Sequence, residues 1–189
     1  MIEMVIESIR VNVLSFQRVV ILRVKDSDRY LPIWIGASEA DAIALKLQDV
    51  QVPRPMTHDL LRSALLSLGA TVSRIVVSDL SDDTFYAKIV IQHNGTTLEV
   101  DSRPSDAIAL AVRTEAPIYA EDAVVEQAGV EMDLESGKPL VADRAGNRTR
   151  PVGEDELKGL SAYQDFIGSL DLENLGQQES PPKGGESEQ

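Results

Sequence analysis

Residues 101–111 have the sequence DSRPSDAIALA, which changes from a polar turn to an apolar run within a few residues. Proline is favoured at the first position of a helix, where its missing N–H is no loss, and Ser and Asp side chains accept hydrogen bonds from the free amides of the first turn. We therefore expect a strand from Thr96 to Asp101 and a helix from Pro104 to Arg113.

A second Arg-Pro pair precedes another predicted helix. Residues 54–59 have the sequence RPMTHD, and the chain then reaches Gly69, a residue typical of the position after a helix. The helix is marked by Leu60, Leu61, Ala64, Leu65 and Leu68. Arginine beside a helix N-terminus is typical of phosphate sites, and clustered carboxylates are typical of divalent-metal sites. The two motifs together indicate phosphodiester chemistry.

Strand patterns fill most of the remaining first two thirds of the chain. Asn94-Gly95 is a strong hairpin signal, because both residues tolerate positive φ. A further helix is expected after Gly36, with Ser38 as its N-cap. The other expected strands are Met4–Leu14, Val19–Val24, Tyr30–Ile35, Thr71–Asp79, Thr84–Gln92 and Pro117–Tyr119. Since strands and helices do not alternate regularly, we predict an α+β fold, a mostly antiparallel or mixed β-sheet packed with a few helices.

The character of the sequence changes after about Gln127. We assign residues 1–130 to one domain and the polar, non-periodic residues 131–152 to a linker or mobile loop. Residues 153–172 predict a short C-terminal amphipathic helix. Its apolar stripe consists of Leu157, Leu160, Tyr163 or Gln164, Ile167 and Leu170. Residues 173–189, rich in Pro, Gly, Glu and Ser, predict a disordered acidic tail.

Composition narrows the classes of function. The net charge is −13, which argues against a broad basic surface, but residues 121–189 hold 16 acidic and 6 basic residues, so the rest of the chain is nearly balanced. The absence of cysteine excludes disulfides, thiolate nucleophiles and Cys-based zinc sites. The sequence shows neither a signal peptide nor an apolar run of about 18 residues. We therefore expect a cytoplasmic protein without a membrane partner.

Four separated motifs resemble the bifunctional nuclease domain family over roughly residues 3–130. They are LPIWIG at residues 31–36, Glu39-Ala40, PRPMTHDL at residues 53–60 and DSRPSDAIALA at residues 101–111. FIGSL at residues 166–170 is similar to the short helix that often follows this domain. The resemblance implies an α+β fold, assembly into a homo-oligomer, and the DNase and RNase activity reported for some members.

The acidic residues of the motifs are candidates for metal-assisted hydrolysis. Carboxylates that hold Mg²⁺ or Mn²⁺ orient a water molecule and lower its pKa. Asp101 and Asp106 would converge on one cation if the Arg-Pro bend turns the chain back, and Asp59 and Glu39 are further candidate ligands. The alternative is that these acids cap helices, complement helix dipoles or pair with Arg54 and Arg103.

The basic residues have the same two interpretations. His58 is a candidate general acid or base, together with the catalytic candidates Asp59, Asp101 and Asp106, or it simply satisfies a nearby carboxylate. The planar guanidinium groups of Arg54 and Arg103 match phosphate, but they match a carboxylate equally well.

Two hypotheses follow. The first is a nuclease of low sequence specificity that acts on DNA or RNA with a divalent metal ion. The second is a non-enzymatic homo-oligomeric module for regulation or interaction, in which the same residues form a buried network. The first requires Asp101, Asp106 and His58 to open onto one cleft, whereas the second allows them to be buried and paired.

Overall fold

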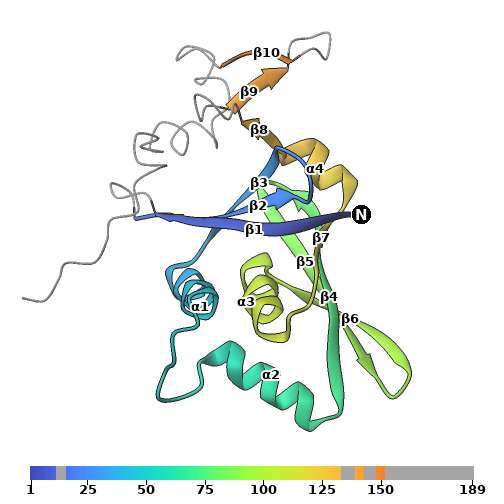
Figure 1. The fold of residues 1–189 in the computed structure, drawn as a ribbon. Helices are drawn as coiled ribbons and strands as arrows, with labels where there is room; N and C mark the ends of the chain where they lie inside the picture. The colour runs from blue at the N-terminus through green and yellow to red at the C-terminus, as the bar shows by residue number, and fades with distance from the viewer. Residues whose placement is uncertain (12–15, 133–138, 143–147, 152–189) are drawn as a thin grey trace, which may run out of the picture.

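A computed structural model describes residues 1–11, 16–132, 139–142 and 148–151 (Figure 1). Its elements are β1 (Ile2–Val11), β2 (Arg18–Val24), β3 (Arg29–Ile35), α1 (Ala37–Leu47), α2 (Thr57–Ser67), β4 (Ala70–Ser81), β5 (Thr84–His93), β6 (Thr96–Ser102), α3 (Pro104–Thr114), β7 (Ile118–Ala120), α4 (Asp122–Ala128), β8 (Val130–Met132), β9 (Pro139–Ala142) and β10 (Arg148–Pro151). The predicted α+β class is confirmed.

The described strands form one mixed sheet in the order β10-β9-β8-β3-β2-β1-β7-β4-β5-β6. All neighbouring pairs are antiparallel except β4 and β7, which are parallel. The turn between β5 and β6 has φ of 49° at Asn94 and 77° at Gly95, as the hairpin signal predicts. The three-residue strand β7 lies between β1 and β4, so it joins the N-terminal strands to the β4–β6 meander.

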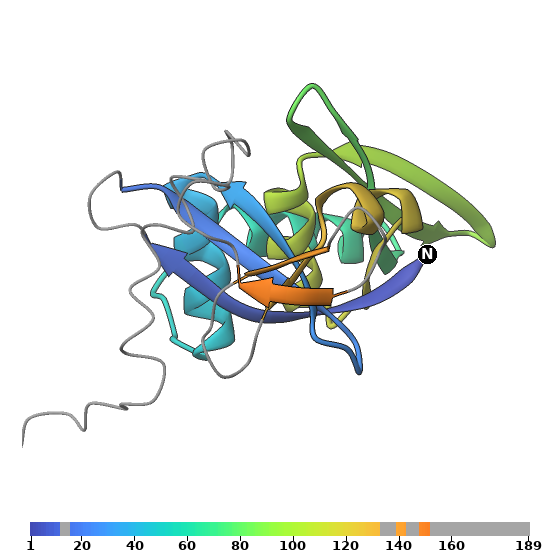
Figure 2. The ribbon, with the colours of Figure 1, turned by 90° about the horizontal axis from the view of Figure 1, so that it is seen from above.

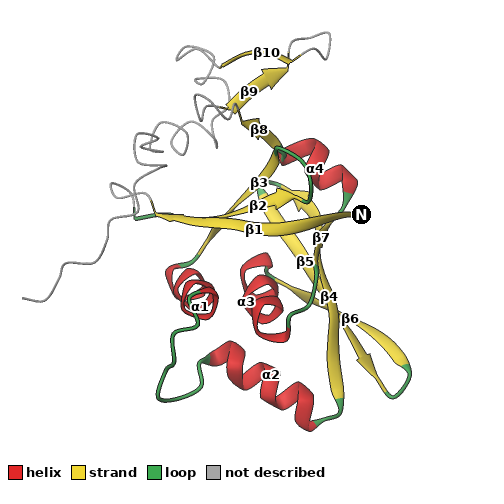
Figure 3. Ribbon diagram, viewed as in Figure 1, coloured by secondary structure: helices red, strands yellow, loops and turns green. Residues whose placement is uncertain are grey.

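Helices α1, α2 and α3 gather on one side of the sheet (Figure 3). Strands β1 to β3 lie over α1 and α3, as the view from above also shows (Figures 1 and 2). Helix α3 packs against α1, α2, β4 and β5. It is therefore covered from several directions, and its residues Ala107, Ile108, Ala109 and Leu110 are fully buried. An apolar run with little polar interruption suits this central position.

Helix α2 is the most exposed of the three. It packs on α3 and the start of β4, and it ends before Gly69, whose φ of 72° fits the predicted stop. However, most of the apolar residues that predict this helix do not face the core. Leu60 is 65% exposed, Leu61 39% and Leu68 70%.

Several predicted boundaries change. Helix α1 begins at Ala37 with Gly36 as its N-cap and no side-chain cap, so the prediction of Ser38 as N-cap is wrong. Residues 12–15 lie outside the described residues, and they include the last three positions of the first predicted strand, 12–14. Residues 131–152, predicted as a linker, contain β9, β10 and the end of β8, so regular structure extends into them. The predicted helix at 153–172 and tail at 173–189 lie outside the described residues.

Within the described ranges, no helix combines the length and apolar character needed to cross a membrane.

Candidate active site

The first turns of three helices meet at one place. Glu39 lies in the first turn of α1, His58 in the first turn of α2, and Asp106 in the first turn of α3, with Arg103 as the N-cap residue of α3. Acids are favoured in first turns because the helix dipole is positive there. Here the packing of α1 and α2 against α3 brings such residues from distant parts of the sequence together. We call these four residues the helix-start cluster.

Hydrogen bonds connect the cluster into a chain. His58 Nε2 lies 3.0 Å from Asp106 Oδ1, Arg103 Nε donates to Asp106 Oδ2 at 2.7 Å, and Arg103 Nη2 donates to Glu39 Oε1 at 2.5 Å. The side chain of Arg103 is 66% exposed, whereas Glu39 and His58 are largely buried. The chain therefore ends in two largely buried side chains, His58 and Glu39, and the exposed Arg103 guanidinium lies between Asp106 and Glu39.

The charges of Arg103 and Asp106 stabilise one another. Burial alone would raise the pKa of Asp106, but the hydrogen bonds from Arg103 and His58 outweigh it and hold this pKa below its usual range. The hydrogen bonds to Asp106 and Glu39 raise the pKa of the Arg103 guanidinium. Because an ionised carboxylate only accepts hydrogen bonds, Nε2 of His58 carries the proton that it shares with Asp106.

The second ring nitrogen of His58 differs from the other polar side-chain atoms of the cluster because it is buried without a hydrogen-bond partner among the described residues. Its Nδ1 is buried, and no described residue hydrogen-bonds to it. In a neutral imidazole with the proton on Nε2, Nδ1 is the basic nitrogen. A buried and unsatisfied polar atom costs free energy and often marks a functional position.

Asp59 belongs to a second network beside the cluster. Its Oδ1 accepts from Nε of Arg113 at 2.7 Å and its Oδ2 accepts from the backbone N–H of Met56 at 2.9 Å. Arg113 also donates to the backbone oxygens of Ala109 at 2.8 Å and Ala42 at 3.1 Å. The pair thus connects the start of α2 to α1 and to the end of α3. Burial acts to raise the pKa of Asp59, but the hydrogen bonds that it accepts from Met56 and Arg113 outweigh this effect and lower the pKa overall.

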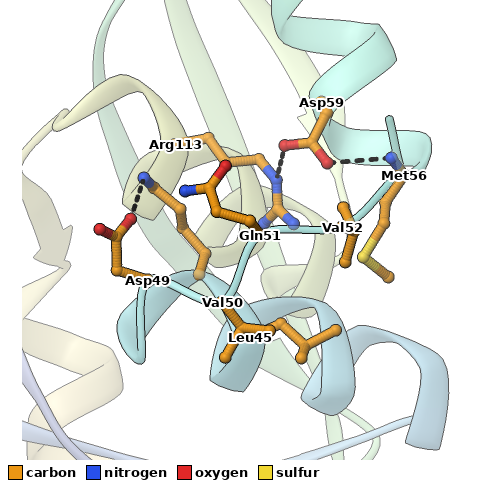
Figure 4. Close-up of a pocket in the computed structure, with 9 residues that line it drawn as sticks. Leu45, Asp49, Val50, Gln51, Val52, Met56, Asp59 and Arg113 are labelled. Carbon is orange, nitrogen blue, oxygen red and sulfur yellow. Dashed lines mark hydrogen bonds and ion pairs between the residues drawn. The ribbon is translucent and has the colours of Figure 1, made fainter. Parts of the chain in front are cut away.

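The Asp59–Arg113 pair borders a recess of about 150 Å³ (Figure 4). The figure shows Asp59 and Arg113 joined by a dashed line, with Met56 on the far side of the carboxylate. Lys46 and Asp49, whose charged groups are 3.8 Å apart, also line the recess. The remaining lining residues are Leu45, Val50, Gln51, Val52 and Met56. Every charge at this recess therefore has an opposite charge beside it.

The structure does not gather all the predicted site residues. Asp101 lies exposed on β6 opposite Lys88 and makes no hydrogen bond to the cluster. Arg54 lies exposed in the loop before α2, where no described residue pairs with it. Asp59 turns toward Arg113 rather than toward Asp106. Arg113 was not predicted as a site residue. It could have been recognised from its position at the end of the apolar run of α3, because a buried arginine there requires an acidic partner.

The described side chains do not fit a single-metal site in this geometry. No three histidine or acidic side chains in the described residues are placed to hold one ion. Between Glu39 and Asp106 lies the Arg103 guanidinium, which already compensates both carboxylates. A cation bound by these two acids would have to displace it.

The family model of the bifunctional nuclease domain matches residues 20–133 of this chain. An uncharacterized protein of Mycobacterium tuberculosis (strain H37Rv) is 41% identical over 170 residues, which is 90% of this chain and 97% of that protein.

Named relatives are more distant. Bifunctional nuclease 1 of Arabidopsis thaliana is 26% identical over 123 residues, covering 63% of this chain and 38% of the plant protein. Bifunctional nuclease 1 of Oryza sativa subsp. japonica is 24% identical over 117 residues, covering 60% of this chain and 35% of that protein. This chain thus spans little more than a third of the length of these plant relatives.

Proposed function

Because this chain belongs to the bifunctional nuclease domain family, we propose that it hydrolyses phosphodiester bonds in DNA or RNA with low sequence specificity. The names of the plant relatives support the reaction class. The observation that carries the proposal for this chain is the helix-start cluster. It combines an exposed guanidinium with a His-Asp pair inside the region that the family model matches.

Phosphate binding is assigned to Arg103. Two of its nitrogens are used by Asp106 and Glu39, but the side chain remains largely exposed. It stands at the N-terminus of α3, where the helix dipole and free amides favour an anion. A backbone phosphate that approaches from solvent would meet this cation first. Such contacts carry no base information, which agrees with low sequence specificity.

Proton transfer is assigned to His58 with Asp106. Attack of water on phosphorus requires a base that takes a proton from the water, and the departing oxygen requires a proton. Asp106 holds Nε2 of His58 and stabilises the imidazolium that forms when Nδ1 accepts a proton. Nδ1 is buried in this conformation, so the assignment requires the start of α2 to move when substrate binds. Assistance by Mg²⁺ or Mn²⁺ stays a prediction. Neither phosphate binding by Arg103 nor proton transfer by His58 depends on it.

The second candidate function is the non-enzymatic homo-oligomeric module. One observation favours it: all four members of the helix-start cluster are engaged with one another, as a network that only holds three helix starts together requires. In that case, a substitution that removes a charge from the cluster changes the free energy of unfolding and has no catalytic activity to affect.

Cleavage of labelled single-stranded RNA and double-stranded DNA by extensively purified protein tests the proposal, with Mg²⁺, Mn²⁺ or EDTA added in parallel. We expect Asp106→Asn to lower the rate by about 100-fold or more, as loss of an acid-base pair does. Asp101→Asn is the matched control, because Asp101 lies outside the cluster. Circular dichroism confirms that each variant is folded.

The outcomes separate the two functions. Cleavage lost in Asp106→Asn and kept in Asp101→Asn supports the cluster as the site. Equal loss in both variants would extend the site onto β6 and restore the predicted role of Asp101. Equal cleavage by all three proteins points to a contaminating nuclease, and no cleavage by the wild type favours the module.

A further inference from the structure

Glu39 occupies the arginine to which phosphate binding is assigned. Nη2 of Arg103 donates to Oε1 of Glu39 at 2.5 Å, because the packing of α1 against α3 brings the two helix starts together (Figure 1). Carboxylate and phosphate oxygens match the same planar guanidinium N–H groups. A phosphate group that approaches Arg103 therefore competes with a carboxylate that is already bound.

Of the two acids on Arg103, Glu39 is the one that a ligand can displace. Asp106 is held twice, because it makes hydrogen bonds with both Arg103 and His58. In the described structure, the Glu39 side chain has Arg103 as its only hydrogen-bond partner. A second anion on Arg103 would repel the Glu39 carboxylate at close range, where like charges interact strongly. Substrate phosphate would therefore take the place of Glu39 and leave Asp106 where it is.

Gly36 provides the space in which the Glu39 carboxylate lies. It is the N-cap residue of α1, and Glu39 follows in the first turn. A Cβ atom at position 36 would lie closer to Oε2 of Glu39 than two unbonded atoms can approach. The φ of −68° at Gly36 is open to any residue, so the backbone itself does not require glycine. The position of Glu39 therefore requires that residue 36 has no side chain.

We propose that Glu39 occupies the phosphate position of Arg103 in the free protein, that substrate phosphate displaces it, and that Gly36 is the positioning residue that allows this. The inference rests on the proposed function, in which Arg103 binds phosphate. When a binding group is free in only a fraction of the molecules, the apparent affinity for a ligand falls by that fraction. Glu39 therefore lowers the affinity for every anion. A small anion with no other contact then binds too weakly, whereas a strand with several phosphates still binds.

Fluorescence anisotropy on the full chain measures this effect. The probe is a fluorescein-labelled single-stranded DNA of about 12 nucleotides, within the usual site size for single strands. EDTA is present, and a denaturing gel verifies that the strand stays intact. We expect Glu39→Gln to bind about 3- to 10-fold more tightly than the wild type, because a charged hydrogen-bonded pair no longer occupies Arg103. A merely structural role of Glu39 would not produce a gain in affinity.

Gly36→Ala separates displacement of the Glu39 side chain from loss of its charge. The variant keeps every charge of the protein but removes the space for the Glu39 carboxylate. We expect it to bind the same strand at least about twofold more tightly than the wild type. Added to Glu39→Gln, it should change the affinity by less than about 1.5-fold, because the two substitutions act through the same contact.

Two further variants serve as controls. Asp41→Asn is the matched charge control, since Asp41 lies on the same helix, is exposed and faces Arg18 rather than Arg103. It should alter the affinity by less than about 1.5-fold. Arg103→Gln tests the phosphate assignment itself and should weaken binding at least about fivefold. Circular dichroism verifies that each variant is folded.

The outcomes separate the inference from the proposed function. Unchanged affinity in Glu39→Gln or in Gly36→Ala would overturn the inference, and so would an equal gain in Asp41→Asn. In each of these cases, weaker binding by Arg103→Gln would still support phosphate binding at Arg103. Unchanged affinity in Arg103→Gln would overturn both. Tighter binding by Glu39→Gln and Gly36→Ala supports the inference even if the wild type cleaves no nucleic acid.

Discussion

Replacing Asp59 with Asn should leave a positive charge without its partner inside the protein. The side chain of Arg113 is only 4% exposed, and its Nε donates to Asp59 Oδ1 at 2.7 Å. Its other two hydrogen bonds go to the uncharged backbone oxygens of Ala109 and Ala42. Asp59 is therefore the only anion in direct contact with Arg113 in the described structure.

The expected cost follows from this burial. Removing one member of a buried ion pair costs about 3 to 5 kcal/mol, because the remaining charge is desolvated and unpaired. Asp59 itself is 32% exposed, so water can partly replace it. We therefore expect a loss of about 2 to 3 kcal/mol in the free energy of unfolding. The amide oxygen of Asn can still accept from the N–H of Met56, so the start of α2 keeps its hydrogen bond.

Urea unfolding at pH 7, followed by circular dichroism, measures this loss as a lower midpoint with an unchanged slope. Asp41→Asn is the matched control: Asp41 is exposed and lies 3.8 Å from Arg18, so it should cost less than about 0.5 kcal/mol. The double variant Asp59→Asn with Arg113→Met removes both charges and should be more stable than the sum of the single losses predicts. If Asp59→Asn costs no more than Asp41→Asn, the Arg113 charge does not depend on Asp59 for its stabilisation.

Three further predictions concern pH, packing and the hairpin. The pKa values of Asp59 and Asp106 are lowered, so their stabilisation is full above the unfolded-state pKa near 4 and disappears as pH falls through the lower folded-state values. The stability gap between wild type and Asp106→Asn should therefore shrink from pH 7 to pH 3, and a constant gap in urea titrations would contradict this. Ile108→Ala should cost about 3 to 4 kcal/mol because Ile108 is fully buried, whereas Leu66→Ala, at an exposed site, should cost less than about 0.5 in the same assay. Gly95→Ala should lower stability by about 1 kcal/mol because φ is 77° there, and an unchanged melting temperature would exclude strain at this turn.

Local signals in the sequence predicted most of the fold correctly. The helix at Pro104, the stop at Gly69 and the turn at Asn94-Gly95 depend on backbone preferences of individual residues, which packing did not overrule. The strands β9 and β10 were not predicted, because four-residue segments are too short for a clear alternating pattern. The N-cap of α1 shifted to Gly36, within the usual variation of helix ends.

The geometry of the candidate site was predictable only in part. Sequence shows which residues begin helices, so Glu39, His58, Arg103 and Asp106 were all found. It does not show which way each side chain turns once helices pack. The partner of Asp59 is 54 residues away in sequence, and no local spacing identifies it. Similarly, Arg54 resembles Arg103 in sequence but remains in an exposed loop.

The position of β7 has a consequence for the order in which the chain folds. This three-residue strand is made after α3, yet it pairs with Met4 and Ile2 on one side and with Ile75, Val76 and Val77 on the other. Until Ile118 to Ala120 leave the ribosome, the early strands and the β4–β6 meander cannot join into one sheet. Because β1 and β7 lie far apart in the sequence, their pairing closes a long loop, which slows folding. We therefore expect one late, cooperative step in which the whole sheet forms. A nascent chain arrested near residue 115 would expose both open strand edges, and chaperones would have to protect them.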